Sequence, residues 1–389
     1  MKEGWEYKRI GDICTVVGGS TPKTEIKEYW GGENYWVTPA ELNGDKYQGA
    51  TSRTITDLAV QKTNLQLLPA GTILLSSRAP IGKVAITTVP MYCNQGFKNI
   101  ICPECLLNDF VYWYLFNKTE YLNSLGTGAT FKEISKKTTE NISIPVPPIA
   151  VQQRIVAELD LLTGIIDKQK AQLKELDMLA QSIFYDMFGD PVENERGWEV
   201  KTLKDSVYEM FLGPFGSALK TEFYVPKDKS YCMIYEQKHA IRKTMDVETH
   251  YIDKSKYDSL RRFEVHSGDF IMSCRGTIGE VYRLPFDAPV GIIHPSLMKI
   301  RIKEDVYNPT FFLWLLSKLI KNESTNGNCV QMAITAKELG QRKPIVPPLS
   351  LQQSFARKIE SIESQKSSIN RSIAETRKLF DYTMDKYFG

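Results

Sequence analysis

The sequence predicts an α+β fold in which two similar mixed α/β domains are joined by two long helices that pair as an antiparallel coiled coil. Three observations lead to this prediction. The length of 389 residues corresponds to two or three domains at about 150 residues each. The second half of the chain repeats motifs of the first half. Each repeat ends in a long segment without proline, which is typical of a continuous helix.

The repeat keeps one register over long distances. Val146-Pro147-Pro148 recurs as Val346-Pro347-Pro348, and Gln152-Gln153 recurs as Gln352-Gln353, both 200 residues later. Ser76-Ser77-Arg78 corresponds to Ser273-Cys274-Arg275 at an offset of 197. Small changes of offset fit insertions in surface loops, which cost little free energy. A period this long indicates duplicated domains rather than a solenoid.

Each repeat begins with a mixed region of strands and helices. Thr72–Leu75 and Phe270–Met272 are apolar, β-branched or aromatic runs bounded by Gly or Asp, which predicts strands. Phe110–Phe116 and Thr310–Leu316 are apolar and follow Asn108-Asp109 and Asn308-Pro309, which predicts buried helices.

The last part of each repeat has the spacing of a helical seam. Alternating steps of four and three lead from Ile155 to Met187 through mostly apolar residues, and the same steps lead from Phe355 to Tyr387. Lys366, Thr376 and Thr383 make the second seam less apolar. Each helix could pack on its own domain, but a helix this long cannot bury its whole seam there, so we favour pairing of the two helices. The predicted parts are residues 1–148, 149–189, 190–348 and 349–389.

Composition and motifs exclude several classes of protein. The net charge of +3 is too small to indicate a partner. The N-terminus lacks a signal-peptide core, and the apolar run Phe311–Leu316 is too short to span a membrane, so we expect a soluble, cytoplasmic protein without a membrane partner. Cys102-Pro-Glu-Cys105 has the spacing of a metal knuckle, but no second pair follows, so we expect a plain loop and no metal.

The duplicated order of motifs resembles the specificity subunit of type I restriction-modification enzymes over nearly the whole chain. The residues that carry the resemblance are the V-P-P-x-x-x-Q-Q start of each long helix, Gly18-Gly19-Ser20-Thr21-Pro22, Trp30-Gly31-Gly32, Trp36-Val37-Thr38-Pro39 and Gly213-Pro214-Phe215-Gly216-Ser217. The resemblance implies that each mixed domain recognises one half of a split sequence in double-stranded DNA. It also implies that the helices set the gap between the halves and dock two modification (methyltransferase) subunits, with restriction subunits bound through them.

The resemblance further implies a chain without catalytic residues or cofactors of its own, with S-adenosylmethionine, ATP and Mg expected on partner subunits. The sequence agrees, because it contains no Asn/Asp-Pro-Pro-aromatic motif and no phosphate-binding G-x-x-x-x-G-K-S/T loop. Pro214 makes Phe211–Gly216 a rigid loop rather than a cofactor turn. The four histidines cannot be placed beside a nucleophile by spacing.

Duplicated polar positions are the candidate DNA contacts. Arg78 and Arg275 precede Ile-Gly turns and suit a guanine or phosphate contact; a surface ion pair is the alternative. Asn94 and His294 are equally suited to a base contact or to an ordinary strand start. The position that corresponds to Lys83 in the second repeat is Glu280, so any role of Lys83 in DNA binding would be specific to the first domain. The other candidates are phosphate donors and loop residues, for which simple turns are the alternative: Thr21, Lys23, Thr38, Ser76, Ser77, Thr127, Lys132, Ser217, Lys220, Ser273 and Gln331.

Two other functions fit the same pattern. A coiled-coil scaffold without DNA specificity would use the twin domains and the helices to gather protein partners. A single-chain nuclease or methyltransferase would need catalytic residues in unfamiliar motifs. The salt dependence of DNA binding distinguishes the scaffold from the predicted DNA-binding protein. Phosphate contacts make the logarithm of the affinity fall with the logarithm of the salt concentration, with a slope of about 0.9 per contact.

Overall fold

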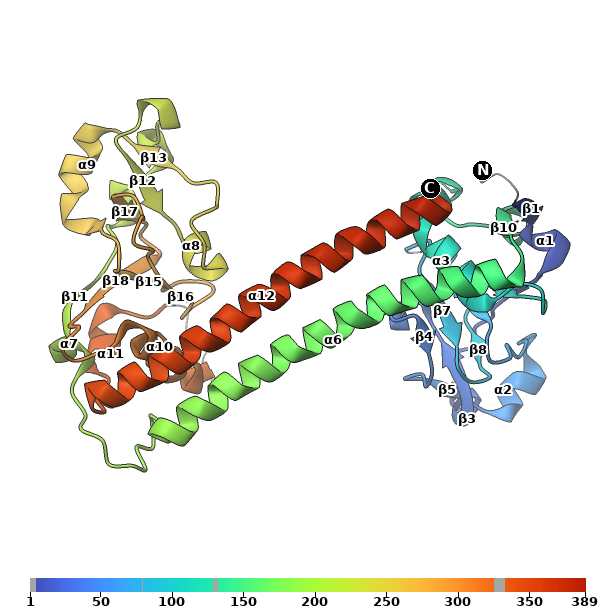
Figure 1. Cartoon of the computed structure of the whole chain (residues 1–389), viewed down its shortest axis with the longest axis horizontal. Helices are drawn as coiled ribbons and strands as arrows, with labels where there is room; N and C mark the ends of the chain where they lie inside the picture. Colours follow the sequence, from blue (N-terminus) through green and yellow to red (C-terminus); the bar gives the residue numbers. More distant parts are fainter. Residues whose placement is uncertain (1–4, 79, 129–131, 325–332) are drawn as a thin grey trace. The chain divides into compact units, whose positions relative to one another are not determined.

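The computed structural model describes residues 5–78, 80–128, 132–324 and 333–389, and the side chains of 321–324 are not considered. The chain forms two compact units. Unit 1 comprises Met1–Lys170 together with Asn370–Gly389, and unit 2 comprises Ala171–Ile369. Each unit contains sheets, short helices and the ends of both long helices (Figure 1).

Unit 1 contains three sheets. The largest has the order β2-β9-β6-β7-β4, and a second has the order β5-β3-β8. A two-stranded sheet pairs β1 with β10, at the beginning and end of the mixed region. The strands are β1 Glu6–Arg9, β2 Thr15–Gly18, β3 Trp30–Val37, β4 Tyr47–Gln48, β5 Thr54–Ile55, β6 Ile73–Leu75, β7 Val84–Thr87, β8 Tyr92–Cys93, β9 Lys98–Ile101 and β10 Ser143–Val146.

Besides the ends of the two long helices, unit 1 contains several short helices, of which one covers the large sheet. This helix, α3, contacts β6 and β7 and buries Phe110, Val111 and Leu115. The helices are α1 Ile10–Ile13, α2 Asp57–Lys62, α3 Asn108–Asn117, α4 Thr119–Ser124 and α5 Lys136–Glu140, with 3₁₀ turns η1 Lys27–Tyr29 and η2 Pro39–Glu41.

Unit 2 repeats this plan with two four-stranded sheets. Their orders are β11-β18-β15-β16 and β13-β12-β17-β14. The strands are β11 Val207–Leu212, β12 Cys232–Tyr235, β13 Tyr251–Ile252, β14 Glu264–Val265, β15 Phe270–Ser273, β16 Val281–Arg283, β17 Gly291–Ile293 and β18 Leu297–Ile302. The shared order shows that β11, β18, β15 and β16 correspond to β2, β9, β6 and β7.

The helices of unit 2 also follow the plan of unit 1. Helix α10 contacts β16 and buries Phe311, Phe312 and Leu315. The helices are α7 Leu203–Ser206, α8 Gln237–Arg242, α9 Lys254–Leu260, α10 Pro309–Ser324 and α11 Ala336–Gln341, and the 3₁₀ turns are η3 Gly216–Ala218, η4 Thr221–Phe223, η5 Lys227–Lys229 and η6 Arg261–Phe263.

Two helices of 40 residues each, α6 Ile149–Phe188 and α12 Leu349–Phe388, complete the cores of the units. In unit 1 the core formed around α3 includes Ile155 and Leu159 from the start of α6 and Phe380 and Tyr387 from the end of α12. The start of one helix therefore lies beside the end of the other, which is an antiparallel arrangement.

Unit 2 shows the same arrangement with the roles of the two helices exchanged. Its core includes Phe184 and Phe188 from the end of α6 and Phe355 and Ile359 from the start of α12, packed against Phe311 of α10. The ring centroids of Phe188 and Phe311 are 4.6 Å apart, and those of Phe184 and Phe355 are 5.6 Å apart. Aromatic packing at these distances adds to the stability from buried area.

These elements confirm the predicted fold class. The strands predicted at Thr72–Leu75 and Phe270–Met272 are β6 and β15, and the predicted buried helices are parts of α3 and α10. Lys366, which weakens the second seam, donates to Asp177 at 2.9 Å and is paired rather than exposed alone. The limits of the four predicted parts remain a prediction.

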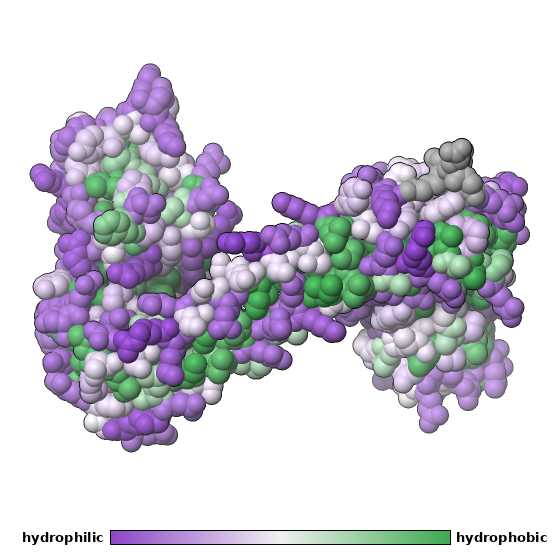
Figure 2. All heavy atoms as spheres, viewed as in Figure 1, coloured by the Kyte–Doolittle hydropathy of each residue, from purple (hydrophilic) through white to green (hydrophobic). Residues whose placement is uncertain are grey.

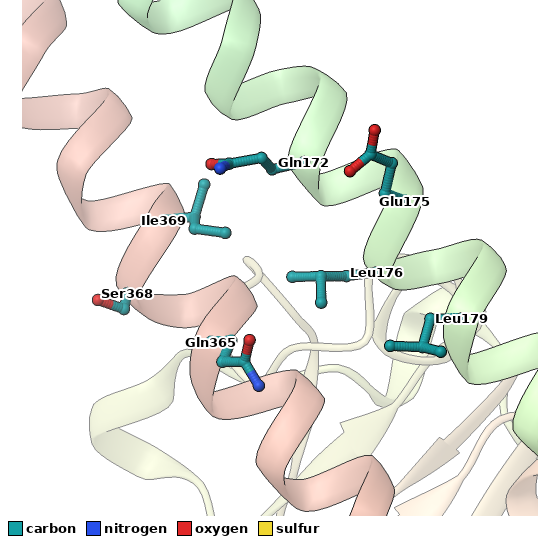
Figure 3. Close-up of a pocket in the computed structure, with 7 residues that line it drawn as sticks. All are labelled: Gln172, Glu175, Leu176, Leu179, Gln365, Ser368 and Ile369. Carbon is teal, nitrogen blue, oxygen red and sulfur yellow. The ribbon is translucent and has the colours of Figure 1, made fainter.

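The paired helices leave an open groove in unit 2. Its volume is about 630 Å³, and its walls come from both helices (Figure 3). The lining residues are Gln172, Glu175, Leu176, Leu179, Gln365, Ser368 and Ile369. Leu179 is 48% exposed, so the helices carry apolar surface that their own pairing does not cover.

A buried glutamine joins each long helix to the mixed region before it. The Gln152 amide donates to Cys105 O (3.1 Å) and Pro147 O (2.8 Å) and accepts from Leu107 N (2.8 Å). The Gln352 amide donates to Val306 O (3.0 Å) and Pro347 O (2.8 Å) and accepts from Asn308 N (2.8 Å). Both side chains are fully buried. One residue thus satisfies three backbone groups in each unit.

We expect Gln152→Leu and Gln352→Leu each to lower the free energy of unfolding of the affected unit by at least about 2 kcal/mol, because each unsatisfied buried polar group costs about 1–3 kcal/mol. Gln153→Leu and Gln353→Leu are matched controls, since these neighbours are exposed. Urea unfolding of the full chain measures the difference. Equal stability of a test variant and its control would contradict the role assigned to the buried amide.

Candidate nucleic-acid interface

Thr38 and Asn94 in unit 1 and His294 in unit 2 lie where two parallel strands end. In unit 1, β3 and β8 pair in parallel up to Val37 and Cys93, and Asn94 N donates to Val37 O at 3.1 Å. Thr38 and Asn94 therefore follow directly at one edge. In unit 2, β12 and β17 pair in parallel in the same way, which brings Glu236 and His294 to the corresponding edge. Polar residues at the carboxyl ends of parallel strands are a common position for ligand contacts.

The first residue at this edge caps a helical turn in both units, with different chemistry. The carboxylate of Glu41 accepts from Thr38 N at 2.8 Å and from Thr38 Oγ1 at 3.1 Å. In unit 2, His239 Nδ1 accepts from Glu236 N at 3.0 Å. The backbone framework is conserved between the units, whereas the side chains that it presents differ.

The glycine loops lie against this edge because only glycine fits there. A Cβ atom on Gly19 would collide with the carbonyl of Asn94, and a Cβ on Gly213 would collide with the carbonyl of His294. In unit 1 the loop is also tied by a hydrogen bond from the Thr21 hydroxyl to the Gln95 side chain. Thr21, Thr38 and Asn94 are thus brought together at this edge.

The loops that carry the two arginines join the same edge. Ser77 N donates to Gly96 O at 2.7 Å, and Cys274 N donates to Ser296 O at 2.9 Å. Arg78 lies 4.0 Å from the carboxylate of Glu133, and Lys98 binds that carboxylate at 2.9 Å. A surface ion pair, the alternative for Arg78, is therefore present.

Arg275 differs from Arg78 in its surroundings. It forms a backbone bridge with Ala333, the counterpart of the Arg78–Glu133 bridge, so no carboxylate stands opposite it. The side chain is exposed and has no ion pair within the described ranges. Gln237 supports its loop by donating to Arg275 O at 2.6 Å and to Thr277 O at 3.2 Å.

The structure corrects the expectation for the three serines. Ser76, Ser77 and Ser273 are fully buried. Ser76 Oγ donates to Pro80 O at 2.7 Å and accepts from Lys83 N at 2.8 Å, and Ser273 Oγ accepts from Glu280 N at 3.0 Å. The hydroxyls of Ser76 and Ser273 hold the turns that carry the arginines, whereas Ser77 Oγ accepts from Lys98 Nζ at 3.2 Å. Because all three are fully buried, the prediction that they donate to phosphates is wrong.

Lys83 is also engaged within the protein. Its ammonium donates to Pro39 O at 3.3 Å and to Leu42 O at 2.7 Å. These carbonyls belong to the 3₁₀ turn η2 and the residue that follows it. An ammonium bound in this way supports η2, and a contact of Lys83 with DNA remains a prediction.

The remaining candidates are mostly exposed. Lys220 lies 3.9 Å from the carboxylate of Glu222. Thr127 pairs through its backbone with Glu133, at 3.1 and 2.9 Å, which places its loop beside Arg78. Contacts of these residues with DNA remain predictions, as do those of Lys23, Lys132 and Ser217, and Gln331 lies outside the described residues.

Sequence analysis missed four residues that shape these edges: Gln95, Glu133, Glu236 and Gln237. Gln95 and Glu133 directly follow the predicted candidates Asn94 and Lys132, and this proximity in the chain is the signal by which they could have been found. Glu236 and Gln237 could not be recognised by the repeat, because Thr38 and Pro39 occupy the corresponding places and differ in type.

The edge of unit 2 holds a shallow pocket of about 250 Å³ lined by Glu236, Gln237, Lys238, His294 and Ser296. Burial raises the pKa of Glu236, but hydrogen bonds with Lys238 and His250 outweigh this and hold that pKa below its ordinary value. Burial lowers the pKa of His294, whose Nδ1 lies 2.8 Å from Ser296 Oγ. This edge therefore holds a carboxylate beside an imidazole that is neutral at neutral pH.

Within the ranges that the structure describes, no group of three or more His, Cys, Asp or Glu side chains could hold a metal ion. Among the same residues, no helix is long and apolar enough to cross a membrane.

We expect mild acid to destabilise the chain through unit 2. Burial lowers the pKa of both His239 and His294. A histidine with a lower pKa in the folded state stabilises the fold fully above its unfolded pKa of about 6.5, and this contribution is lost as the pH falls below that value. Urea unfolding at pH 7.5 and 5.5 should show a smaller loss for His294→Asn than for the unmodified chain. An equal loss would contradict this assignment.

Comparison with known proteins agrees with the duplicated architecture. The model of the type I restriction modification DNA specificity domain matches residues 2–177 and again residues 195–376. Two solved structures share the fold over 100% of this chain and 98% of their own: the type I restriction-modification S subunit from M. genitalium (TM-score 0.57, 14% identity) and a chain from a study of assembly and conformational transition in the type I R-M system (TM-score 0.67, 18% identity).

Relatives in sequence carry the same description. The type I restriction enzyme MjaIX specificity subunit of Methanocaldococcus jannaschii is 40% identical over 224 residues, which are 53% of this chain and about half (52%) of that protein. The EcoKI specificity subunit of Escherichia coli is 21% identical over an alignment that covers 100% of this chain and 89% of that protein. With two copies of the family's domain over most of its length, the chain belongs to the family of type I restriction-modification DNA specificity proteins.

Proposed function

We propose that each unit recognises one half of a split sequence in double-stranded DNA. The observation that carries this proposal is the pair of equivalent edges with different side chains. Thr38 and Asn94 occupy in unit 1 the places of Glu236 and His294 in unit 2. The same backbone framework supports both sets, as expected of two domains that bind the same kind of ligand but distinguish different base sequences.

The chemistry of the edges suits DNA. Asn accepts and donates at the edge of adenine, and Glu accepts from the amino group of cytosine. Arg275 and Lys23 are exposed and suit contacts with phosphate oxygens, which position a protein on the duplex without carrying sequence information. Positioning and discrimination would thus come from neighbouring groups of one surface.

The long helices would set the gap between the two half-sites and dock methyltransferase subunits. Hydrophobic side chains lie on the surface of these helices (Figure 2). Leu161 and Met178 of α6 are 64% and 63% exposed, and Tyr382 of α12 is 67% exposed. Large exposed apolar side chains outside the helical seam favour a protein partner. Restriction subunits would join through the methyltransferase subunits.

The chain itself would supply specificity without catalysis, in the cytoplasm. Methylation and cutting would belong to the partner subunits, with S-adenosylmethionine, ATP and Mg bound there. Membership of the specificity family supports this division of labour. Binding of radiolabelled S-adenosylmethionine by the purified chain alone would contradict it.

Selection from a random duplex pool tests the central proposal. The tagged full chain is recovered with the partners that copurify with it, and the retained DNA is sequenced. We expect two different short sequences separated by a gap of fixed length that is not recognised. A protein partner without any enriched DNA sequence would instead favour a scaffold function.

Shortening both helices tests their role as a spacer. Deleting one heptad from α6 and the facing heptad from α12 preserves the seam and shortens the pair by about 10 Å. We expect the gap to shrink by about three base pairs, at about 3.4 Å per pair along the duplex. The same selection measures the gap. Both half-sites should remain unchanged, and an unchanged gap would rule out the helices as the spacer.

A further inference from the structure

Arg53 of unit 1 holds an unusual position that the sequence-based analysis did not identify. Its guanidinium carbon lies 3.8 Å from the centroid of the Trp30 ring and 5.2 Å from that of the Trp36 ring. The two indoles pack edge to face, with centroids 5.1 Å apart and planes at 83°. A cation over aromatic rings is attracted by their electron-rich faces, and more strongly where it is less hydrated.

The backbone fixes this stack. Trp36 N donates to Arg53 O at 3.2 Å, which places the two residues directly opposite each other beside β3 and β5. Side chains that lie directly opposite in an antiparallel pair point to the same face. Trp36 itself is 2% exposed, so the platform under the guanidinium is part of the folded core.

The same indoles hold the glycine loop of the candidate interface. Trp36 Nε1 donates to Ser20 O at 3.0 Å, and Trp30 Nε1 donates to Lys23 O at 3.3 Å. The loop between these two carbonyls contains Thr21, which bonds to Gln95 beside Asn94. Arg53 is therefore attached to the surface proposed to face DNA.

The N–H groups of Arg53 remain available. The side chain is exposed and has no hydrogen bond or ion pair to any of the residues described. Glu41, the carboxylate that binds the neighbouring residue Ser52, already accepts from Ser52 N at 2.7 Å, Ser52 Oγ at 2.9 Å and Thr38 N at 2.8 Å. The stack thus orders the guanidinium plane without using its donors.

The corresponding residue of unit 2 is used differently. Ile234 N donates to His250 O at 2.8 Å, so His250 lies where Arg53 lies in unit 1. The His250 ring stacks on Tyr224 with centroids 4.4 Å apart, but its Nδ1 bonds to the carboxylate of Glu236. Each unit stacks a nitrogen-bearing side chain on an aromatic ring here, and unit 1 presents a free planar fork of donors.

We propose that Arg53 recognises a guanine in the half-site bound by unit 1, with two N–H groups donating to O6 and N7 of the base. This inference rests on the proposed function. A guanidinium fixed in one plane suits this bidentate geometry, and its ordering cost is met before DNA binds. A phosphate can be bound equally by a flexible lysine, so it does not require the stacked platform.

The test compares variants of the full chain, recovered with its partners, in the duplex selection. Arg53→Ala should reduce the preference for guanine at one position of one half-site about tenfold or more, the range of a bidentate contact. The other half-site should be unchanged. Lys62→Ala, which removes an exposed positive charge from α2 of the same unit, is the matched control and should leave both half-sites intact.

Arg53→Lys guards against a variant that fails to fold. It keeps the charge but lacks the planar fork, so it should lose the guanine preference while retaining most of the affinity and the thermal unfolding temperature. Replacing the selected guanine by 7-deazaguanine, which lacks N7, should weaken binding by the unmodified chain several-fold and by Arg53→Ala hardly at all. Equal weakening of both would overturn the proposal.

The role of the platform has its own prediction. Trp30→Phe keeps an aromatic face under the guanidinium and should preserve the guanine preference, whereas Trp30→Ala should diminish it at the same position. A loss in both variants, or in neither, would show that stacking does not orient Arg53.

The outcomes distinguish the inference from the function beneath it. If the unmodified chain enriches no split sequence, the proposed function fails. If it does, but Arg53→Ala weakens all sequences alike and lowers the salt dependence by about 0.9 logarithmic units, then Arg53 contacts a phosphate and the guanine proposal is wrong.

Discussion

The buried glutamine at the start of each long helix is the constraint on which the arrangement of each unit depends. Gln152 and Gln352 each bind three backbone groups that lie in the mixed region and just before the helix. The start of the helix is therefore fixed relative to α3 or α10, and the aromatic core between them packs in one orientation. A recognition surface can be carried at a defined place only if this joint is rigid.

Sequence alone predicted the features that depend on periodicity and repetition. The duplicated motifs gave the two units, and the steps of four and three gave the paired helices, because both signals extend over many residues. The serines illustrate what such signals leave out. Ser76 and Ser273 occupy equivalent places, but their equivalence arises from the buried turn that they hold and not from a shared ligand. Lys83 is a further example, because its ammonium donates to carbonyls about 40 residues earlier in the chain, which periodicity and repetition do not reveal.

The candidate edges were predicted only in part, since their likeness lies in the backbone. The same helical cap is made by Glu41 on Thr38 in unit 1 and by His239 on Glu236 in unit 2. Because the side chains are unrelated in type, aligning the two repeats does not reveal this likeness. Gly19 and Gly213, by contrast, were visible because close approach to a carbonyl excludes every other residue. This separation has a physical benefit. The framework is held by main-chain bonds and glycines, and the presented side chains can change without disturbing it.

Unit 1 is completed by Asn370–Gly389, which are synthesised after the whole of unit 2. Until they leave the ribosome, Phe110, Ile155 and Leu159 lack the cover of Phe380, Met384 and Phe388, with which they share one core. Unit 1 therefore cannot finish folding until unit 2 has been synthesised, so the two units do not fold strictly in chain order. During this interval the uncovered apolar surface of unit 1 is exposed, and exposed apolar surface binds chaperones or aggregates. A product truncated before Asn370 would leave this part of the core of unit 1 uncovered.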